Sequence, residues 1–297
     1  MKKRLTYQIA EVVPYINWLY FYHAWGLSGK PRAEKEKIQE EAQNLLRDWQ
    51  DKYHTHALFT LYEAYSDGDD LLLDGFRMPM LRQQHPASLN QPNLCLADFV
   101  CPISQKSSKN SSVQSADLPM EQASVQPSYP GIANHVGVFC ATVDGGLAEA
   151  YRHDEYLGMM AQVLSDRLAE ATAEKLHQEV RKSYWGYAPD EQLSIPQLHH
   201  EEYQGIRPAI GYPSLPDTSA NFIIDQLLDM KQVGIRLTET GMMTPHASVS
   251  GLMFAHPQAR YFELGKIDDT QLRDYARRRG IPVEMMRRFL QSSLMRK

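Results

Sequence analysis

Hydrophobic and polar positions follow two different periods along this chain. Aromatic and apolar residues on all sides predict a buried helix over about 11–26, and apolar positions at helical spacing predict an amphipathic helix over 32–53. The period then changes, and three segments are predicted as strands: "HALFTLYEAY", "LLLDGF" and "HVGVFCATV". "LCLADFV" is a further short apolar run of the same kind.

The second half of the chain is mainly helical. The longest helical pattern covers 146–184, where apolar residues lie close to a 3.6-residue period. Shorter helices are predicted near 196–203 and over 221–233, and Gly280 separates two closing helices. Short strands are expected around "RLTET", "GLMFA" and "YFELG". Because strands and helices mix without regular βαβ alternation, the pattern favours an α+β fold with an antiparallel sheet.

A Ser-, Gln- and Pro-rich segment interrupts the pattern at about 104–131. It carries few large apolar groups, so it cannot bury enough surface to order itself strongly. It leads from one predicted strand into another. We therefore expect a mobile surface insertion within a single domain that spans residues 1–297.

Composition narrows the class of protein. The 297 residues carry a formal net charge of -5, which argues against a broad nucleic-acid surface. The locally basic C-terminal end (Arg277, Arg278, Arg279, Arg287, Arg288) is interpreted as a solvated helix face. Three cysteines without a CxxC pair indicate reduced, buried thiols. No apolar run of about 18 residues occurs, so we expect neither a signal peptide nor a membrane span, and a cytoplasmic location.

Familiar catalytic and metal-binding motifs are absent from the sequence. There is no GxGxxG, GxxxxGK[ST], GxSxG or HExxH pattern. His54 and His56 lack a third ligand at suitable spacing, and "LHHEE" (199–202 with Leu198) is interpreted as a solvated surface. We therefore predict no catalytic residue and no metal site.

The stretch "RPAIGYPSLPD" (207–217) is the best candidate for a binding loop. Three prolines stiffen it, so it cannot lie inside a helix or a central strand. Arg207 suits a bidentate contact with a carboxylate, Gly211 allows close approach to the main chain, and Tyr212 adds an aromatic face and a hydroxyl. The alternative, which composition alone favours, is a rigid turn whose arginine pairs with an internal acid.

"GIRPAIGYPSLPD" closely resembles the signature of the S-adenosylmethionine-binding activation domain of cobalamin-dependent methionine synthase. Other segments resemble the same family in the same order: "LCLADFV", "DRLAEATAEKLHQEVRKSYWGYAPDEQLS", "HASVSGLMFAHPQARYF" and "LRDYARRRG". The resemblance implies a C-shaped α+β domain with a bent antiparallel sheet flanked by helices. It also implies that S-adenosylmethionine is presented to cobalamin, held by the partner, while flavodoxin or a similar reductant supplies an electron.

The resemblance assigns roles to individual residues. Arg207 corresponds to the arginine that binds the methionyl carboxylate, and Ala209 and Gly211 lie on the main-chain segment that meets the ligand. Tyr212 and Tyr261 match tyrosines on the cobalamin-facing side of the site. Glu170 matches a ligand-contacting glutamate that could accept the α-ammonium group.

Two positions depart from the family pattern. Asn17 stands where the family has aspartate, in "YINW", and should weaken binding because the charge attraction is lost. Thr218 to Asn221 replace the usual "HTEK", which puts contacts to the cobalamin module or loop closure in doubt.

No homocysteine, folate or cobalamin module fits in this length, and the initiating methionine and the intact ending favour a stand-alone protein. We therefore expect a reactivation subunit that acts in trans on the cobalamin module of a methionine synthase, with no nucleic-acid or membrane partner. Whether it counts as an enzyme by itself is left open. Two alternatives remain: a reactivation partner of a different corrinoid methyltransferase, and a non-catalytic binding module of the same fold.

Overall fold

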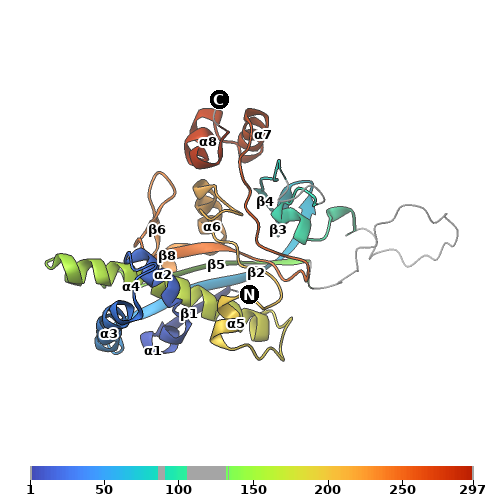
Figure 1. Cartoon of the computed structure of the whole chain (residues 1–297). Coiled ribbons are helices and arrows are strands. Elements are labelled where there is room, and N and C mark those ends of the chain that lie inside the picture. Colours follow the sequence, from blue (N-terminus) through green and yellow to red (C-terminus); the bar gives the residue numbers. More distant parts are fainter. Residues whose placement is uncertain (1, 86–90, 106–131, 133, 296–297) are drawn as a thin grey trace.

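The computed structural model describes residues 2–85, 91–105, 132 and 134–295, and it has the expected α+β architecture (Figure 1). In the described part, one six-stranded antiparallel sheet has the order β4-β3-β2-β5-β8, with β1 paired to β2 outside this path. Its strands are β1 (Lys2–Gln8), β2 (His54–Asp67), β3 (Asp70–Leu73), β4 (Phe76–Pro79), β5 (His135–Val143) and β8 (Ser248–Met253). A separate two-stranded ribbon consists of β6 (Arg236–Leu237) and β7 (Met243–Thr244).

The sheet curls because the long strand β2 changes partner along its length. Its first half, up to Thr60, pairs with β1, and its last residues, Ala64 to Asp67, pair with β3. On its other edge β2 pairs with β5 from Thr55 to Glu63. A strand that serves two partners in succession must twist and bend between them.

Helices cover both faces of this sheet (Figure 1). One face carries α4 (Glu155–Glu179), which contacts β2, β5 and β8, together with α1 (Ile9–Val12) and α3 (Arg32–Trp49). The other face carries α6 (Asn221–Leu228), with α7 (Asp269–Arg279) and α8 (Val283–Phe289) beyond it. The short helices α2 (Trp18–Ala24) and α5 (Ile195–His199) flank α4.

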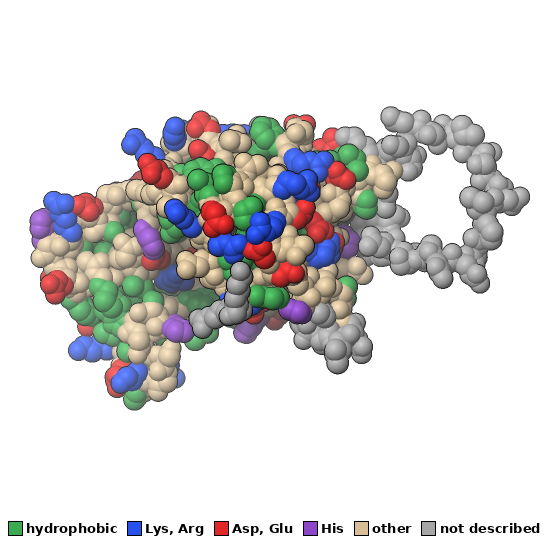
Figure 2. All heavy atoms as spheres, turned by 90° about the horizontal axis from the view of Figure 1, so that it is seen from above, with side chains coloured by type: hydrophobic (Ala, Val, Ile, Leu, Met, Phe, Trp, Pro, Cys, Tyr) green, Lys and Arg blue, Asp and Glu red, His purple; other side chains and the backbone are tan. Residues whose placement is uncertain are grey.

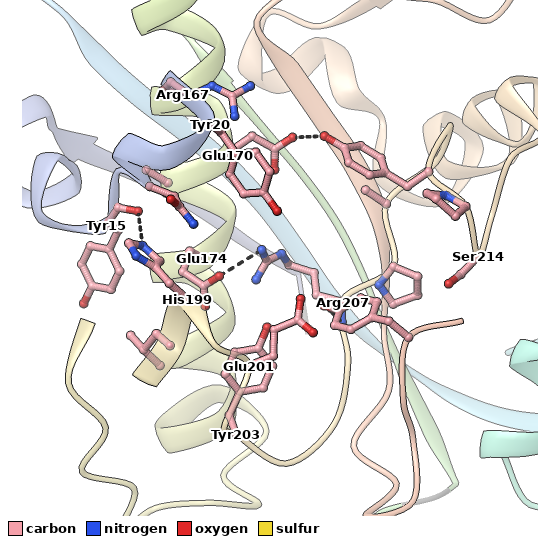
Figure 3. A pocket seen from close by; sticks show the side chains of 18 of the residues that line it. Tyr15, Tyr20, Arg167, Glu170, Glu174, His199, Glu201, Tyr203, Arg207 and Ser214 are labelled. Atoms are coloured by element: carbon pink, nitrogen blue, oxygen red, sulfur yellow. Dashed lines mark hydrogen bonds and ion pairs between the residues drawn. The ribbon is translucent and has the colours of Figure 1, made fainter. Parts of the chain in front are cut away.

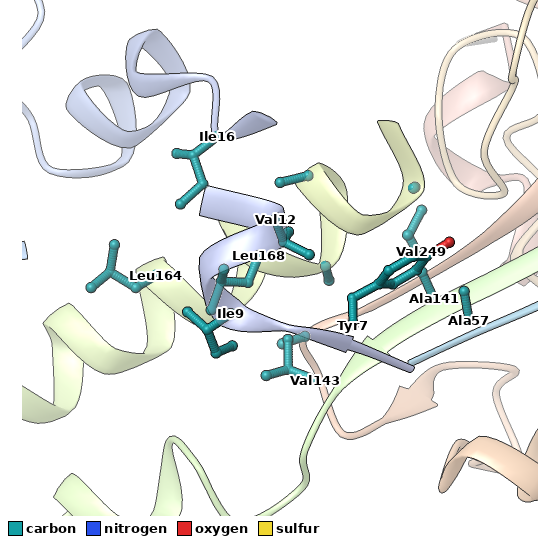
Figure 4. Packing of buried hydrophobic residues seen from close by; sticks show 14 of the residues in the cluster. Tyr7, Ile9, Val12, Ile16, Ala57, Ala141, Val143, Leu164, Leu168 and Val249 are labelled. Atoms are coloured by element: carbon teal, nitrogen blue, oxygen red, sulfur yellow. The ribbon is translucent and has the colours of Figure 1, made fainter. Parts of the chain in front are cut away.

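Alternation along the strands produces two hydrophobic cores. Ala57 and Ala141 belong to the cluster that packs under α4 (Figure 4), whereas their neighbours Leu58 and Cys140 belong to the cluster that packs against α6. Successive side chains of a strand point to opposite faces, so each central strand must be apolar on both. This requirement explains why "HALFTLYEAY" and "HVGVFCATV" are almost continuously apolar.

The structure confirms the main elements and corrects several boundaries. The first predicted helix is broken at Ile16 and Asn17 into α1, a 3-10 turn and α2, and the strand β1 before it was not expected. In "LLLDGF" the strand ends at Leu73. Asp74 and Gly75 both have positive φ and form the turn of the hairpin that leads into β4. "LCLADFV" forms a 3-10 helix at 96–99, and "YFELG" forms no strand.

The predicted helix over 146–184 begins later than expected. Its α-helical part starts after Asp154, whose side chain accepts a hydrogen bond from Leu157 N at 2.9 Å, and it ends in a π turn over Val180–Tyr184. Most of the predicted insertion, 106–131, lies outside the described residues. Its expected mobility therefore stays a prediction. Within the described chain, no helix is both long and apolar enough to cross a membrane.

The basic C-terminal end is only partly a solvated face. Charges of both signs are interspersed over this side of the molecule (Figure 2). Arg277 is exposed and pairs with Asp274, whereas the Arg279 side chain is only 4% exposed and pairs with Asp217. The helix therefore uses part of its positive charge to attach itself to the rest of the domain.

The three cysteines differ in burial. Cys95 and Cys140 are buried, whereas Cys101 is half-buried. The prediction of buried thiols is therefore wrong for one of the three.

Candidate functional site

A cleft of about 670 Å³ opens beside α4, between the N-terminal helices and the loop that joins α5 to α6 (Figure 3). We call it the α4 cleft. Its lining residues come from four segments, within 15–20, 167–174, 198–214 and 261–263. These segments are far apart in sequence, so the cleft exists only in the folded chain.

The proline-rich loop is fixed to the sheet by its backbone. Residues 206–210 run beside β8, where Leu252 N donates a hydrogen bond to Pro208 O at 3.1 Å and Ala209 bridges to Gly251. A Cβ atom at Gly251 would lie 2.3 Å from Pro208 O, so only glycine permits this approach. The loop thus forms an added edge to the sheet, where the missing N–H of proline costs no ladder bond.

Arg207 projects from this loop into the cleft, where it meets Glu174 of α4 (Figure 3). Its Nη2 donates to Glu174 Oε2 at 3.1 Å, and its Nη1 lies 3.4 Å from His177 Nδ1. Its backbone N–H donates to the Tyr261 hydroxyl at 2.8 Å. Burial lowers the pKa of the Arg207 guanidinium, but the nearby Glu174, Tyr203, Tyr261 and Glu170 together outweigh burial, and the pKa is raised.

Further buried polar groups pack around His177, the histidine that Arg207 contacts. Arg181 forms an ion pair with Glu191 at 2.7 Å, and its guanidinium lies 4.0 Å from the centre of the Tyr203 ring. The Tyr203 ring in turn packs edge-on against His177. Burial, reinforced by Arg181 and Arg207, holds the pKa of His177 well below its usual value, so this imidazole is neutral and can accept from Arg207.

Tyr212 and Glu170 bridge the outer part of the cleft. The Tyr212 hydroxyl donates a hydrogen bond to the Glu170 carboxylate, which joins the proline-rich loop to α4 (Figure 3). Tyr212 remains half exposed, so its ring is available to a molecule outside the cleft. Arg167 lies one turn before Glu170, and its buried Nε has no hydrogen-bond partner among the described residues.

The remaining wall comes from the first helices and from the segment after α5. Asn17 Oδ1 accepts from Leu19 N at 3.1 Å and caps α2, which leaves its amide nitrogen as a donor. His199 Nε2 lies 3.0 Å from the Tyr15 carbonyl oxygen, joining α5 to this wall. Glu201 has a positive φ of 57°, and its side chain lines the cleft near Arg207.

Six of the seven predicted ligand contacts line this one cleft: Asn17, Glu170, Arg207, Ala209, Tyr212 and Tyr261. Gly211 does not line it; its N–H donates to Leu215 O at 2.8 Å, inside the turn of the loop. The turn needs glycine there because its φ is +90°. What the six residues bind stays a prediction.

Sequence reasoning missed several residues of the cleft. Glu174 lies one helical turn after Glu170, so the 3.6-residue period alone could have placed both on the same face. The solvated-surface interpretation of "LHHEE" holds for Glu201, which is exposed, but it did not indicate that Glu201 and the half-buried His199 line the cleft. The helix ends at His199, and the left-handed backbone of Glu201 then redirects the chain, which periodicity does not reveal.

The altered segment after the loop has a structural role. Ser219, Ala220 and Asn221 are buried, and Asn221 Nδ2 donates to Gly241 O at 2.8 Å. Asp217 accepts from Ser219 N at 2.9 Å and from the Tyr275 hydroxyl at 2.8 Å. This part of the chain therefore packs inside the domain and attaches the loop to α7.

His54 and His56 both face Asp144. His56 Nε2 lies 2.8 Å from Asp144 Oδ1, and His54 Nδ1 lies 3.8 Å from Asp144 Oδ2. Over the residues that the structure describes, no group of three or more His, Cys, Asp or Glu side chains is arranged to hold a metal ion. In the α4 cleft, by contrast, a buried arginine beside several carboxylates suits a ligand that carries both charges.

Comparison with known proteins points to one family. The family model described as "Vitamin B12 dependent methionine synthase, activation domain" matches residues 8–280. A crystal structure of the MetH reactivation domain bound to AdoHcy is similar to this chain, with 34% sequence identity and a TM-score of 0.84. That similarity covers 100% of this chain and 91% of the other. Both matches include every segment that lines the α4 cleft.

Proposed function

This chain belongs to the family of vitamin B12-dependent methionine synthase activation domains, and we propose that it binds S-adenosylmethionine in the α4 cleft. We propose further that it supports reductive methylation of the cobalamin carried by a partner, which restores an inactive methionine synthase. The observation that carries this proposal is the position of Arg207, held rigidly inside a cleft whose walls lie within the family match.

The residues of the cleft fit such a ligand. Its volume of about 670 Å³ is within the range of small-molecule sites. Arg207 would bind the ligand's carboxylate, and the backbone around Ala209 would lie against the ligand. Two buried polar atoms, Glu174 Oε1 and Arg167 Nε, have no hydrogen-bond partner within the described chain, and both residues line the cleft. Buried polar atoms of this kind are expected where a ligand completes the hydrogen bonding.

The proposed methyl transfer requires no general acid or base from the protein. S-adenosylmethionine, when bound, supplies an already activated methyl group for transfer to reduced cobalt. The residues of the cleft therefore bind, orient and exclude water, and no triad is needed. Tyr212 and Tyr261 would form the side of the site that faces the partner's cobalamin, with Tyr212 half exposed for that contact.

The partners follow from the same reasoning. The cobalamin-binding module of a methionine synthase would present its cobalt at the cleft, and flavodoxin or a similar reductant would supply one electron. Methylcobalamin and S-adenosylhomocysteine would be the products. We propose that this chain acts in trans, on a synthase without this domain.

Calorimetric titration of the chain with S-adenosylmethionine and S-adenosylhomocysteine tests the binding step. Arg207→Ala should weaken binding at least about 30-fold, because truncation leaves buried charges unpaired. Arg32→Ala is the matched control, since Arg32 is an exposed arginine that pairs with Glu36 on the surface. No detectable binding to the unmodified chain at millimolar ligand would refute the proposal.

The transfer step needs its own assay. The chain, S-adenosylmethionine and a chemical or flavodoxin reductant are mixed with a methionine synthase fragment that carries cob(II)alamin. We expect the absorption of cob(II)alamin to be replaced by that of methylcobalamin only when all components are present. Ligand binding without this conversion would identify the chain as a binding module.

The alternative of a different corrinoid partner gains no support from the segment Thr218 to Asn221. Three of its four side chains are buried, and its polar groups bond within the domain. These side chains therefore contribute to packing within the domain.

A further inference from the structure

We propose that His177 is a positioning residue for the α4 cleft: it holds the guanidinium of Arg207 in one orientation before a ligand arrives, and it does not contact the ligand itself. The inference rests on the proposed function, because it concerns how the binding group of that site is kept in place. His177 lies on α4 beside Arg207 and is not among the described residues that line the cleft.

Two contacts from α4 fix the guanidinium of Arg207. Its Nη1 lies 3.4 Å from His177 Nδ1, and its Nη2 donates to Glu174 Oε2 at 3.1 Å. The bond to Tyr261 comes from the backbone N–H, so it holds the chain and not the guanidinium. A planar guanidinium anchored at one nitrogen can still swing about that contact, whereas an anchor at each terminal nitrogen fixes its plane.

This arrangement leaves most donors of Arg207 for a ligand. A guanidinium has five N–H groups, and the two contacts to α4 use one from each terminal nitrogen. The side chain is 13% exposed and lines the cleft, where a carboxylate would accept from the remaining groups. An arginine whose plane is fixed in advance loses less conformational freedom on binding, which strengthens binding.

Packing in turn fixes the imidazole of His177. The side chain is fully buried, and its ring is nearly perpendicular to that of Tyr203, with 4.9 Å between the ring centres. The guanidinium of Arg181 lies 4.0 Å from the centre of the Tyr203 ring and pairs with Glu191 at 2.7 Å. A side chain held by packing and by a paired charge is the rigid support that a precise site requires.

The hydrogen bonding of His177 favours a positioning role over packing alone. Burial, Arg181 and Arg207 lower the pKa of His177, so the imidazole is neutral and can accept at Nδ1. The proton then lies on Nε2, which is buried and has no hydrogen-bond partner within the described chain. An unsatisfied buried donor is costly, and an apolar side chain would avoid that cost. The contact with Arg207 accounts for a histidine at this position.

Calorimetric titration of full-chain variants with two ligands tests the proposal. S-adenosylhomocysteine carries a carboxylate, whereas 5′-methylthioadenosine has the same nucleoside and sulfur but no carboxylate. His177→Leu removes the acceptor, and His177→Asn keeps an amide oxygen near the position of Nδ1. Leu164→Ala is the matched control, because Leu164 is a buried residue of α4 that does not line the cleft.

We expect His177→Leu to weaken binding of S-adenosylhomocysteine about tenfold, because the charged Arg207 loses a hydrogen bond. Binding of 5′-methylthioadenosine should be almost unchanged, since that ligand has no carboxylate for Arg207. His177→Asn should retain most of the affinity for S-adenosylhomocysteine. Leu164→Ala should destabilise the fold in urea but keep the ratio of the two affinities.

Several results would overturn the proposal. Equal weakening of both ligands by His177→Leu would assign His177 a purely structural role. Equal losses in His177→Leu and His177→Asn, or unchanged binding of S-adenosylhomocysteine in His177→Leu, would also contradict it. The comparison of these two variants uses S-adenosylhomocysteine alone, so it serves even where 5′-methylthioadenosine binds too weakly to measure.

Two further outcomes are kept apart. If His177→Leu does not fold, His177→Gln replaces it, because its amide lies near the position of Nε2 and should not serve Arg207; affinity equal to that of His177→Asn would then overturn the proposal. Absence of S-adenosylhomocysteine binding to the unmodified chain refutes the proposed function itself.

Discussion

The carboxylate of Asp217 lies 3.0 Å from the guanidinium of Arg279, and both side chains are almost completely buried. Asp217 ends the proline-rich loop, and Arg279 is the last residue of α7. The Tyr275 hydroxyl donates to the same carboxylate at 2.8 Å. Helix α7 is therefore joined electrostatically to the loop that carries Arg207.

Removing the charge of Asp217 should destabilise the whole domain. We expect Asp217→Asn to lower the free energy of unfolding by about 3 kcal/mol or more, because Arg279 would remain as a buried charge without a counterion. Asp269→Asn breaks two exposed pairs, with Arg273 and Arg287, and should cost much less. Urea denaturation of both variants measures the two costs; equal costs would contradict the prediction.

Gly251 should tolerate no side chain. A Cβ there would lie 2.3 Å from Pro208 O and 2.9 Å from Ala209 Cα, and both are backbone atoms that cannot rotate away. Gly251→Ala should therefore cost at least about 2 kcal/mol and weaken ligand binding, because the Pro208–Ala209 backbone must move. Gly145→Ala is the control, since nothing lies within 4 Å of its added Cβ. Thermal denaturation with calorimetric titration tests both effects.

Asn17→Asp should strengthen ligand binding without weakening the fold. Aspartate caps a helix as well as asparagine, so the bond from Leu19 N can remain. The added negative charge in the wall of the cleft should tighten binding of the positively charged S-adenosylmethionine about three- to tenfold. Competition titrations compare this variant with Asn17→Ala, which removes both the cap and the polar contact. Unchanged affinity in Asn17→Asp would show that this position does not contact the ligand.

His177 should make the domain less stable in mild acid. Burial holds its folded-state pKa well below the usual 6.5, so below pH 6.5 the unfolded chain binds more protons than the folded one. Stability is then lost as pH falls from 6.5 towards the folded-state pKa, at up to about 1.4 kcal/mol per pH unit. Urea denaturation at pH 7.0 and 5.5 measures this loss.

A matched pair of variants isolates the contribution of His177. His177→Gln should reduce the loss of stability between these two pH values, whereas His200→Gln, at an exposed position, should leave it unchanged. The same loss in His177→Gln as in the unmodified chain would assign the pH dependence to other groups.

The sequence by itself determined the fold class, the central strands and the long helix. Strands β2 and β5 are apolar on both faces, and α4 keeps its helical period. The local pattern of apolar residues was therefore sufficient to predict these three elements. The proline-rich loop was also evident, because proline excludes the alternatives locally. The family resemblance named six residues that the structure brings to one cleft.

Only the tertiary structure decided how that cleft is built. Arg207 and Glu174 are 33 positions apart, and no local sequence pattern predicts that they form an ion pair. The left-handed turn at Glu201 brings a segment that looks solvated into the cleft wall, and Asp217 meets Arg279 from the far end of the chain. Such contacts depend on where whole elements pack against the sheet. Periodicity fixes which face of an element is buried, but it does not fix which distant charge that face will meet.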